Sequence, residues 1–169
     1  MPDDGPAAVL VVGLGNELRR DDGAGIMVAR DLIARGTGPG IEVRELPGEP
    51  IALLDAWQAC DAAVVIDAMC SGAVPGTITR LDAQCEPLHE TLRGSPSTHV
   101  VSLVDTLELG RALDKLPRRL IVYAVEGREF TAGAGVSEAV RAALPGVADS
   151  VLREAWRLRD EAARSSSAG

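Results

Sequence analysis

The chain has 169 residues, enough for about one domain with a proper hydrophobic core. Hydrophobic residues make up 46% of the sequence and aromatic residues only 2%, so we expect a core of Val, Leu, Ile and Ala, as in helices packed on a parallel sheet. The 17 Lys and Arg residues against 25 Asp and Glu give a net charge of −8, which opposes binding to nucleic acid or to anionic membranes.

The sequence predicts a cytoplasmic protein with a single domain over residues 1–169. No apolar run approaches the ~20 residues of a membrane span, and residues 1–6 lack the basic and apolar regions of a signal peptide. The three cysteines match no disulfide framework or zinc pattern, so we interpret them as free thiols. We expect an ordered core over about residues 7–163, with a mobile lead-in (1–6) and tail (164–169).

The first predicted elements are a buried strand, a loop and an amphipathic helix. Val9–Val12 is apolar throughout, which is typical of a strand covered on both faces in a parallel sheet. The loop GLGNELRRDD follows, and apolar residues then recur at helical spacing over Gly25–Arg35. Open α/β sheets bind ligands beyond the carboxyl ends of their strands. The loop carboxylates Glu17, Asp21 and Asp22 therefore favour a cation site.

Two other interpretations apply to this loop. A dinucleotide fingerprint, GxGxxG, would need glycine where Leu18 stands, and two aspartates would repel a pyrophosphate. Alternatively, Asp21 or Asp22 could cap the following helix by accepting hydrogen bonds from its free N–H groups. For Asp21 we expect such a cap or a supporting position behind the site, so Asp21→Asn should change stability little and keep activity.

The rest of the chain alternates strands with helices, which predicts an α/β fold. The predicted elements are a strand at Ile41–Leu46, a helix at about Ile51–Ala59, a strand at Ala62–Ile66, an edge or antiparallel strand at Gly76–Leu81, a long loop at Asp82–Ser97, a helix capped by Ser97 or Thr98 that ends before Pro117, a strand at Leu120–Val125, a short helix from Ser137 that ends at Pro145-Gly146, and a helix at Val147–Ala163.

A second carboxylate and a histidine are predicted to lie near the loop carboxylates. The strand Ala62–Ile66 stops at Asp67, and His99 falls in the first turn of the helix that begins near Thr98. With Asp22 they form a set of two carboxylates and one imidazole, which suits Zn, Ni, Mn or Fe better than copper or an iron–sulfur cluster. A single histidine at a helix start could equally be structural or solvated.

Three motifs in order resemble those of the hydrogenase maturation endopeptidases. GLGNELRRDDGAG resembles the family's opening G-x-G-N-x-x-x-x-D-D/E-G-x-G. VVIDAMCSGAVPGTI resembles its second motif, an Asp-Ala after an apolar strand followed by a P-G-T-I/L turn. SPSTHVVSLVDTLELGRAL is similar to the third, a Ser/Thr-rich lead before a histidine and a Leu-rich helix. The order and spacing hold over about residues 8–160.

The resemblance implies a three-layer α/β/α sandwich with a mostly parallel, twisted sheet of about five strands, one of them antiparallel. It also implies an endopeptidase that removes a C-terminal extension from the large-subunit precursor of a NiFe hydrogenase after nickel insertion. The family's metal-contacting and catalytic positions fall on Asp22, Asp67 and His99, and nickel would be carried by the precursor. Many members have glutamate at the position of Asp22, whereas Glu17 does not align with the acidic ligand.

Two rival functions use the same residues. A cysteine peptidase would pair Cys70 with His99, but the sequence places no helix N-terminus or basic neighbour beside Cys70 to activate its thiol. The absence of GxSxG argues against the usual serine hydrolase. A nickel-dependent chaperone or binding module that recognises the immature subunit without cutting it would share all three motifs.

Overall fold

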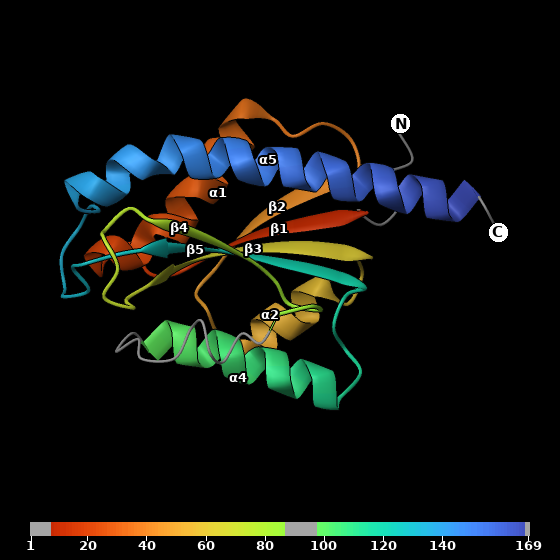
Figure 1. Cartoon of the computed structure of the whole chain (residues 1–169), viewed down its shortest axis with the longest axis horizontal. Helices are drawn as coiled ribbons and strands as arrows, with labels where there is room; N and C mark the ends of the chain where they lie inside the picture. Colours follow the sequence, from red (N-terminus) through yellow and green to blue (C-terminus); the bar gives the residue numbers. More distant parts are fainter. Residues whose placement is uncertain (1–7, 87–97, 168–169) are drawn as a thin grey trace.

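The sheet of this protein has five strands in the order β2-β1-β3-β5-β4 (Figure 1). The computed structural model describes residues 8–86 and 98–167, and for residues 98–102 it describes only the helical backbone. The strands are β1 (Val9–Leu14), β2 (Ile41–Leu46), β3 (Ala62–Met69), β4 (Ile78–Asp82) and β5 (Arg119–Glu126). All neighbours pair in parallel except β4, which is antiparallel to β5 at the edge, as its alternating sequence predicted.

Helices cover both faces of the sheet and make three layers (Figure 1). α1 (Ala24–Arg35) and α5 (Glu138–Ser167) pack on one face, and α2 (Pro50–Trp57) and α4 (Thr98–Ala112) pack on the other. The predicted α/β/α sandwich with one antiparallel strand is therefore confirmed. No helix in the part of the chain that the structure describes is long and apolar enough to cross a membrane.

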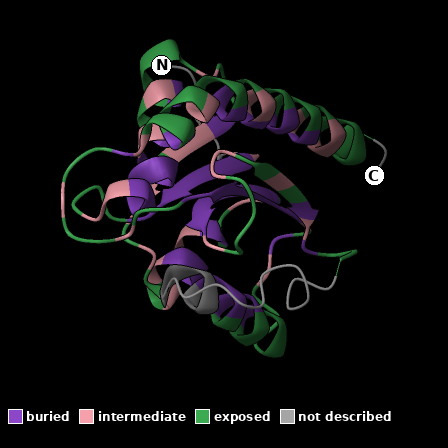
Figure 2. Cartoon of the chain, turned by 60° about the vertical axis from the view of Figure 1, so that its left-hand side comes forward, coloured by how far each residue is buried: buried purple, intermediate pink, exposed green. Residues whose placement is uncertain are grey.

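The central strands contribute side chains to both cores, which explains their uninterrupted apolar sequences. In β3, Val64 and Ile66 pack against α1 and α5, whereas Ala63 and Val65 pack against α2 and α4. All four side chains are buried, and Figure 2 shows the central strands buried between the helical layers. Each Val, Leu or Ile buried in this way stabilises the fold by about 1.5–3 kcal/mol.

Helix α5 is longer than the sequence predicted. Pro145-Gly146 was expected to end a short helix and Arg164 to begin a mobile tail, but α5 runs from Glu138 to Ser167 with Pro145 inside it. An internal proline costs about 3 kcal/mol. Val140 and Val147, on either side of it, are fully buried in the same core, and this burial keeps the helix continuous. The predicted lead-in and most of the predicted loop 82–97 lie outside the described residues.

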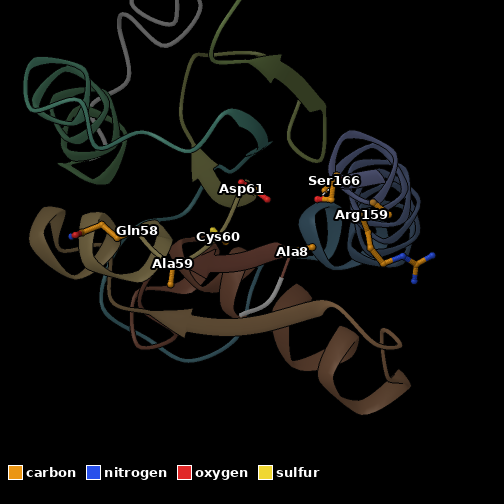
Figure 3. A pocket seen from close by; sticks show the side chains of 9 residues that line it. Ala8, Gln58, Ala59, Cys60, Asp61, Arg159 and Ser166 are labelled. Carbon is orange, nitrogen blue, oxygen red and sulfur yellow. Dashed lines mark hydrogen bonds between the residues drawn. The ribbon is translucent and has the colours of Figure 1, made fainter. Parts of the chain in front are cut away.

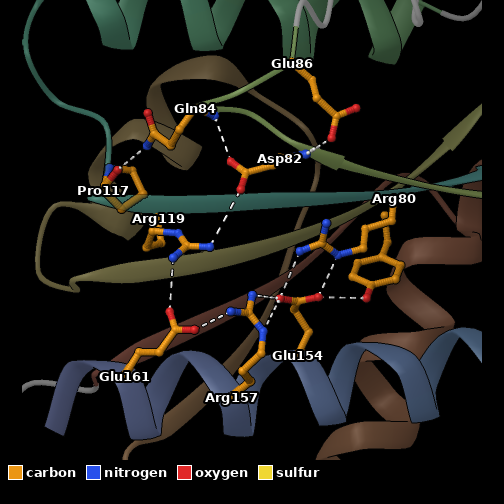
Figure 4. Close-up of polar contacts among 10 residues, drawn as sticks. Arg80, Asp82, Gln84, Glu86, Pro117, Arg119, Glu154, Arg157 and Glu161 are labelled. Carbon is orange, nitrogen blue, oxygen red and sulfur yellow. Dashed lines mark hydrogen bonds and ion pairs between the residues drawn. The ribbon is translucent and has the colours of Figure 1, made fainter. Parts of the chain in front are cut away.

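A network of ion pairs joins α5 to the β4–β5 edge of the sheet (Figure 4). The buried Glu154 carboxylate accepts hydrogen bonds from Arg80 on β4 (Nε, 2.7 Å), from Arg157 one helical turn away, and from the Tyr123 hydroxyl (3.2 Å). Burial raises the pKa of Glu154, but the bonds to Arg80 and Arg157 outweigh this and lower the pKa to about 2, from 4.5 for an ordinary glutamate.

Because of this network, we expect the folded protein to lose stability as the pH falls. Because the folded-state pKa of Glu154 is depressed, the stabilisation is complete above the unfolded pKa of 4.5 and is lost as the pH falls toward about 2. The shift corresponds to at most about 3 kcal/mol. We expect Glu154→Gln to lower the Tm at neutral pH, and the Tm difference from wild type to shrink between about pH 5 and pH 2 in thermal melts. A difference that stays constant across this range would contradict the assignment.

Candidate active site

The site lies where the strand order reverses, between β1 and β3. From β1 the chain proceeds to β2 on one side of the sheet, whereas β3 and β5 lie on the other side. In open α/β sheets, a crevice opens at such a switch point beyond the carboxyl ends of the strands. The pairing of β1 with β3 ends at Gly13 opposite Ile66. Asp67 is the next residue of β3, and Asp22 lies in the loop after β1, so both predicted carboxylates lie toward the carboxyl ends of these two strands.

Asp22 is brought back to the end of β1 by a compact loop. It lies in a short 3-10 helix, Arg20–Gly23, with 1% of its surface exposed. The Asn16 N–H donates to the Asp22 carbonyl (3.3 Å). Gly15 has φ of 135°, and a Cβ atom there would lie 1.8 Å from the Asp22 carbonyl oxygen. Glycine is needed at this position because the returning backbone passes so close to it.

Gly25, the last glycine of the motif, allows close packing at the same end of the sheet. A Cβ atom on Gly25 would lie 2.4 Å from the carbonyl oxygens of Leu14 and Ile66. Helix α1 can therefore begin directly against the ends of β1 and β3. The glycine motif thus brings backbone segments together around Asp22, which explains its presence without a dinucleotide.

Asp67 is buried on the face of the sheet that α2 and α4 cover. Only 1% of its surface is exposed, and its Oδ1 accepts a hydrogen bond from the Ala68 N–H (2.9 Å). Side chains alternate along a strand, and the neighbours at two residues' distance, Val65 and Met69, belong to the core under α2 and α4. The Asp67 carboxylate therefore lies on this face, at the carboxyl end of β3.

The backbone of His99 lies in the first turn of α4, which begins at Thr98. α4 packs on the same face as Asp67, and its first turn is at the end of the sheet to which the parallel strands point (Figure 1). The fold thus brings this helix start to the edge and face that hold Asp67. The side chain of His99 lies outside the described part of the structure, so its predicted contact with the two carboxylates stays a prediction.

Asp21 does not cap a helix, so that interpretation was wrong. Neither the 3-10 helix nor α1 has a capping bond from a side chain. The fully buried Asp21 carboxylate instead accepts hydrogen bonds from the N–H groups of Arg128 (2.8 Å), Glu129 (3.0 Å) and Ser137 (2.6 Å) and from the Ser137 hydroxyl (3.0 Å). Burial raises the pKa of Asp21, but these four bonds outweigh it and hold the pKa below its usual range.

Backbone hydrogen bonds tie the same two segments together. Gly127–Ser137, which we call the β5–α5 loop, connects the end of β5 to the start of α5. The Gly133 N–H donates to the Leu18 carbonyl (2.8 Å), and the Gly133 carbonyl accepts from the Arg20 N–H (3.0 Å). The Asp21 N–H donates to the Glu129 carbonyl (2.9 Å). Sequence reasoning missed this contact because it joins segments more than a hundred residues apart, and their glycines indicate only a loop.

Glu126 is a further buried carboxylate that the sequence analysis did not single out. It ends β5, with 1% of its surface exposed, and accepts hydrogen bonds from the N–H groups of Ser71 (2.8 Å) and Gly72 (2.9 Å) and from the Ser71 hydroxyl (2.8 Å). It therefore fixes the loop that follows β3 and Asp67. The only sequence signal was its position at the end of an apolar strand.

The remaining candidates lie apart from this arrangement or carry other interactions. The exposed Glu17 forms an ion pair with Arg30. Burial raises the pKa of the Cys60 thiol to about 11, which keeps it protonated. Cys60 lines a cavity of about 490 Å³ at the amino ends of β1 and β3, opposite the crevice (Figure 3). Among the side chains that the structure describes, which do not include that of His99, no three His, Cys, Asp or Glu form a metal-binding cluster.

Solved structures with this fold include a protease of hydrogenase maturation and an endopeptidase. The [NiFe] hydrogenase maturation protease HybD from Thermococcus kodakarensis superimposes with a TM-score of 0.72 and 27% identity, over 87% of this chain and 98% of that one. An endopeptidase from Escherichia coli gives a TM-score of 0.77 and 26% identity, over 88% of this chain and 91% of the other.

Sequence comparison also leads to hydrogenase-related proteins. A family model described as hydrogenase maturation protease matches residues 26–154, a range that contains Asp67 and His99 and begins after Asp22. The hydrogenase expression/formation protein HoxM of Azotobacter vinelandii is 29% identical over 138 residues, which are 80% of this chain and 66% of HoxM. HupD of Rhodobacter capsulatus is 27% identical over 93% of this chain and 73% of its own length. The chain belongs to the hydrogenase maturation protease family.

The loop that carries Asp22 contains one strained residue, which allows a test of its geometry. Arg20 has φ of 52°, in the left-handed region that β-branched residues avoid. Toward the described residues its side chain makes one exposed ion pair, with Glu129 (3.7 Å), which contributes little. We expect Arg20→Asn to keep the free energy of unfolding nearly unchanged and Arg20→Val to lower it by about 1–2 kcal/mol in urea denaturation. Equal stability of the two variants would contradict a left-handed conformation here.

Proposed function

We propose that this protein is an endopeptidase that removes a C-terminal extension from the large-subunit precursor of a NiFe hydrogenase after nickel has been inserted. The observation that carries this proposal is the pair of buried carboxylates, Asp22 and Asp67, at the switch point between β1 and β3. Family membership supports the reaction class, and the two carboxylates lie toward the carboxyl ends of β1 and β3, where open α/β sheets bind ligands. Three free cysteines favour a reducing compartment, and we place the reaction in the cytoplasm.

The proposed chemistry is hydrolysis of one peptide bond by water. A carboxylate of Asp22 or Asp67 accepts the proton of the attacking water and returns it to the amine that leaves, which makes the reaction aspartic in type. Burial favours this role because a carboxylate shielded from bulk water interacts more strongly with the reacting groups. His99, in the first turn of α4, completes the proposed set.

Nickel enters this proposal as part of the substrate. Two carboxylates with one imidazole form a donor set that suits nickel, but three protein ligands without a thiolate leave its coordination incomplete. We propose that the precursor presents the metal and that Asp22, Asp67 and His99 contact it there. Nickel insertion would then become the signal that permits cleavage.

The test is the intact mass of the precursor after incubation with this protein. The protein is first stripped with a chelator and desalted, and it is then given either nickel-loaded or nickel-free precursor. We expect loss of the C-terminal extension from the nickel-loaded form only. Equal cleavage of the nickel-free form, or a requirement to reload the protein with zinc, would overturn the role of nickel. Binding of the nickel-loaded precursor without any mass change would favour the alternative, a nickel-dependent chaperone.

The proposed site residues can be tested by substitution. We expect Asp67→Ala and His99→Ala to stay folded and to lose processing, because they remove groups from a strand end and a helix start at the edge of the core. Circular dichroism checks the fold, and precursor mass measures activity. Processing at the wild-type rate by either folded variant would remove that residue from the site.

Asp22→Glu supplies the matched conservative change. It keeps the charge, adds one methylene, and restores the side chain that many members of the family carry. We expect it to be the mildest substitution at the three positions, with a folded and active product, whereas Asp22→Ala abolishes processing. A folded but inactive Asp22→Glu would contradict the assignment of Asp22 as the acidic group of the first motif.

A further inference from the structure

Two buried carboxylates stand side by side in the chain at the site, and they differ in their surroundings. Asp22 is the proposed reactive group, whereas the Asp21 carboxylate accepts its four hydrogen bonds from the β5–α5 loop. Burying a carboxylate is costly unless hydrogen bonds compensate for the lost hydration. Four such bonds converge on Asp21, and three come from backbone N–H groups that any sequence would supply. This contact therefore depends mainly on the identity of residue 21, because its carboxylate must be present to accept the four bonds.

The bonds to Asp21 act on the backbone that carries Asp22. The β5–α5 loop also pairs with Leu18 and Arg20 through the two bonds of Gly133, and Arg20 holds its strained left-handed conformation between them. The Asp22 N–H in turn donates to the Arg19 carbonyl (3.2 Å). The Asp22 backbone is therefore held in two ways. Hydrogen bonds within its own loop hold it directly, and the bonds from the β5–α5 loop to Asp21 hold the residue before it.

We propose that Asp21 is a positioning residue: its carboxylate ties the β5–α5 loop to the segment that carries Asp22 and thereby holds the Asp22 carboxylate in place for hydrolysis. The consequence for the reaction rests on the proposed function, whereas the tie between the two segments does not. Misplacement of a reacting group by about 1 Å can cost a hundredfold in rate. The β5–α5 loop, far away in sequence, thus belongs to the machinery of the first motif.

The substitution Asp21→Asn separates the charge of the side chain from its shape. In Asp21→Asn one oxygen becomes an NH₂ group, which must face an N–H donor, because both carboxylate oxygens accept N–H bonds. We therefore expect Asp21→Asn to loosen the tie, in contrast to the mild effect that the sequence predicted. Ser137→Ala is the weaker second variant, since it removes one of the four bonds and retains the Ser137 N–H.

Glu154→Gln is the matched control for a loss of stability alone. Glu154 is also a buried carboxylate saturated by donors, but it lies in the middle of α5 at the β4–β5 edge. Variants are compared on nickel-loaded precursor at a temperature where all are folded. For Asp21→Asn we expect kcat to fall by about tenfold or more with KM within about threefold, for Ser137→Ala a smaller fall, and for Glu154→Gln an unchanged kcat.

Hydrogen exchange of the free protein tests the tie without using activity. We expect peptides that cover residues 16–24 and 128–137 to lose protection together in Asp21→Asn and to keep it in Glu154→Gln. Unchanged exchange, or an unchanged kcat in folded Asp21→Asn, would overturn the positioning role. If the wild-type protein fails to cut the precursor, the proposed function fails by itself, and the exchange result still decides whether Asp21 joins the two segments.

Discussion

Parallel pairing of β1 with β3 is the constraint that organises the site. The pairing ends at Gly13 opposite Ile66, and the chain leaves the two strands toward opposite sides of the sheet. Backbone groups beyond that point need other partners, and the space between the strand ends is open to polar side chains. Asp67 continues β3 past the last pair, and the loop after β1 returns so that the short helix Arg20–Gly23, which carries Asp22, packs against β3. The position of the site thus follows from the strand order.

The return of that loop depends on close approach between backbone segments. Gly15 lies against the Asp22 carbonyl, and Gly25 lies against the carbonyls that end β1 and β3, at distances that a side chain would not permit. The β5–α5 loop then closes over the segment from Leu18 to Asp21. The first motif therefore depends on a second segment that follows it by more than a hundred residues.

The buried carboxylates divide into groups according to their partners. Glu154 is neutralised by arginine side chains and serves the attachment of α5 to the sheet. Asp21 and Glu126 are satisfied mainly by backbone N–H groups, and each fixes a loop beside the crevice. A charge held by fixed dipoles is compensated and orders the chain around it. These two residues therefore order the loop that carries Asp22 and the loop that follows Asp67.

The sequence by itself determined the strands and their class of sheet, because burial on both faces leaves an apolar run. From the residues that follow two of these runs it predicted Asp22 and Asp67 as site residues, which stays a prediction. It also indicated the antiparallel strand through alternation. Only the tertiary structure decided that Asp21 contacts Arg128 and Ser137, and that Glu126 holds Ser71, since these bonds join residues distant in the chain. The continuous α5 was decided in the same way. Proline usually breaks a helix, so the sequence alone predicted an end at Pro145. α5 nevertheless continues, because its buried face packs on the sheet both before and after Pro145.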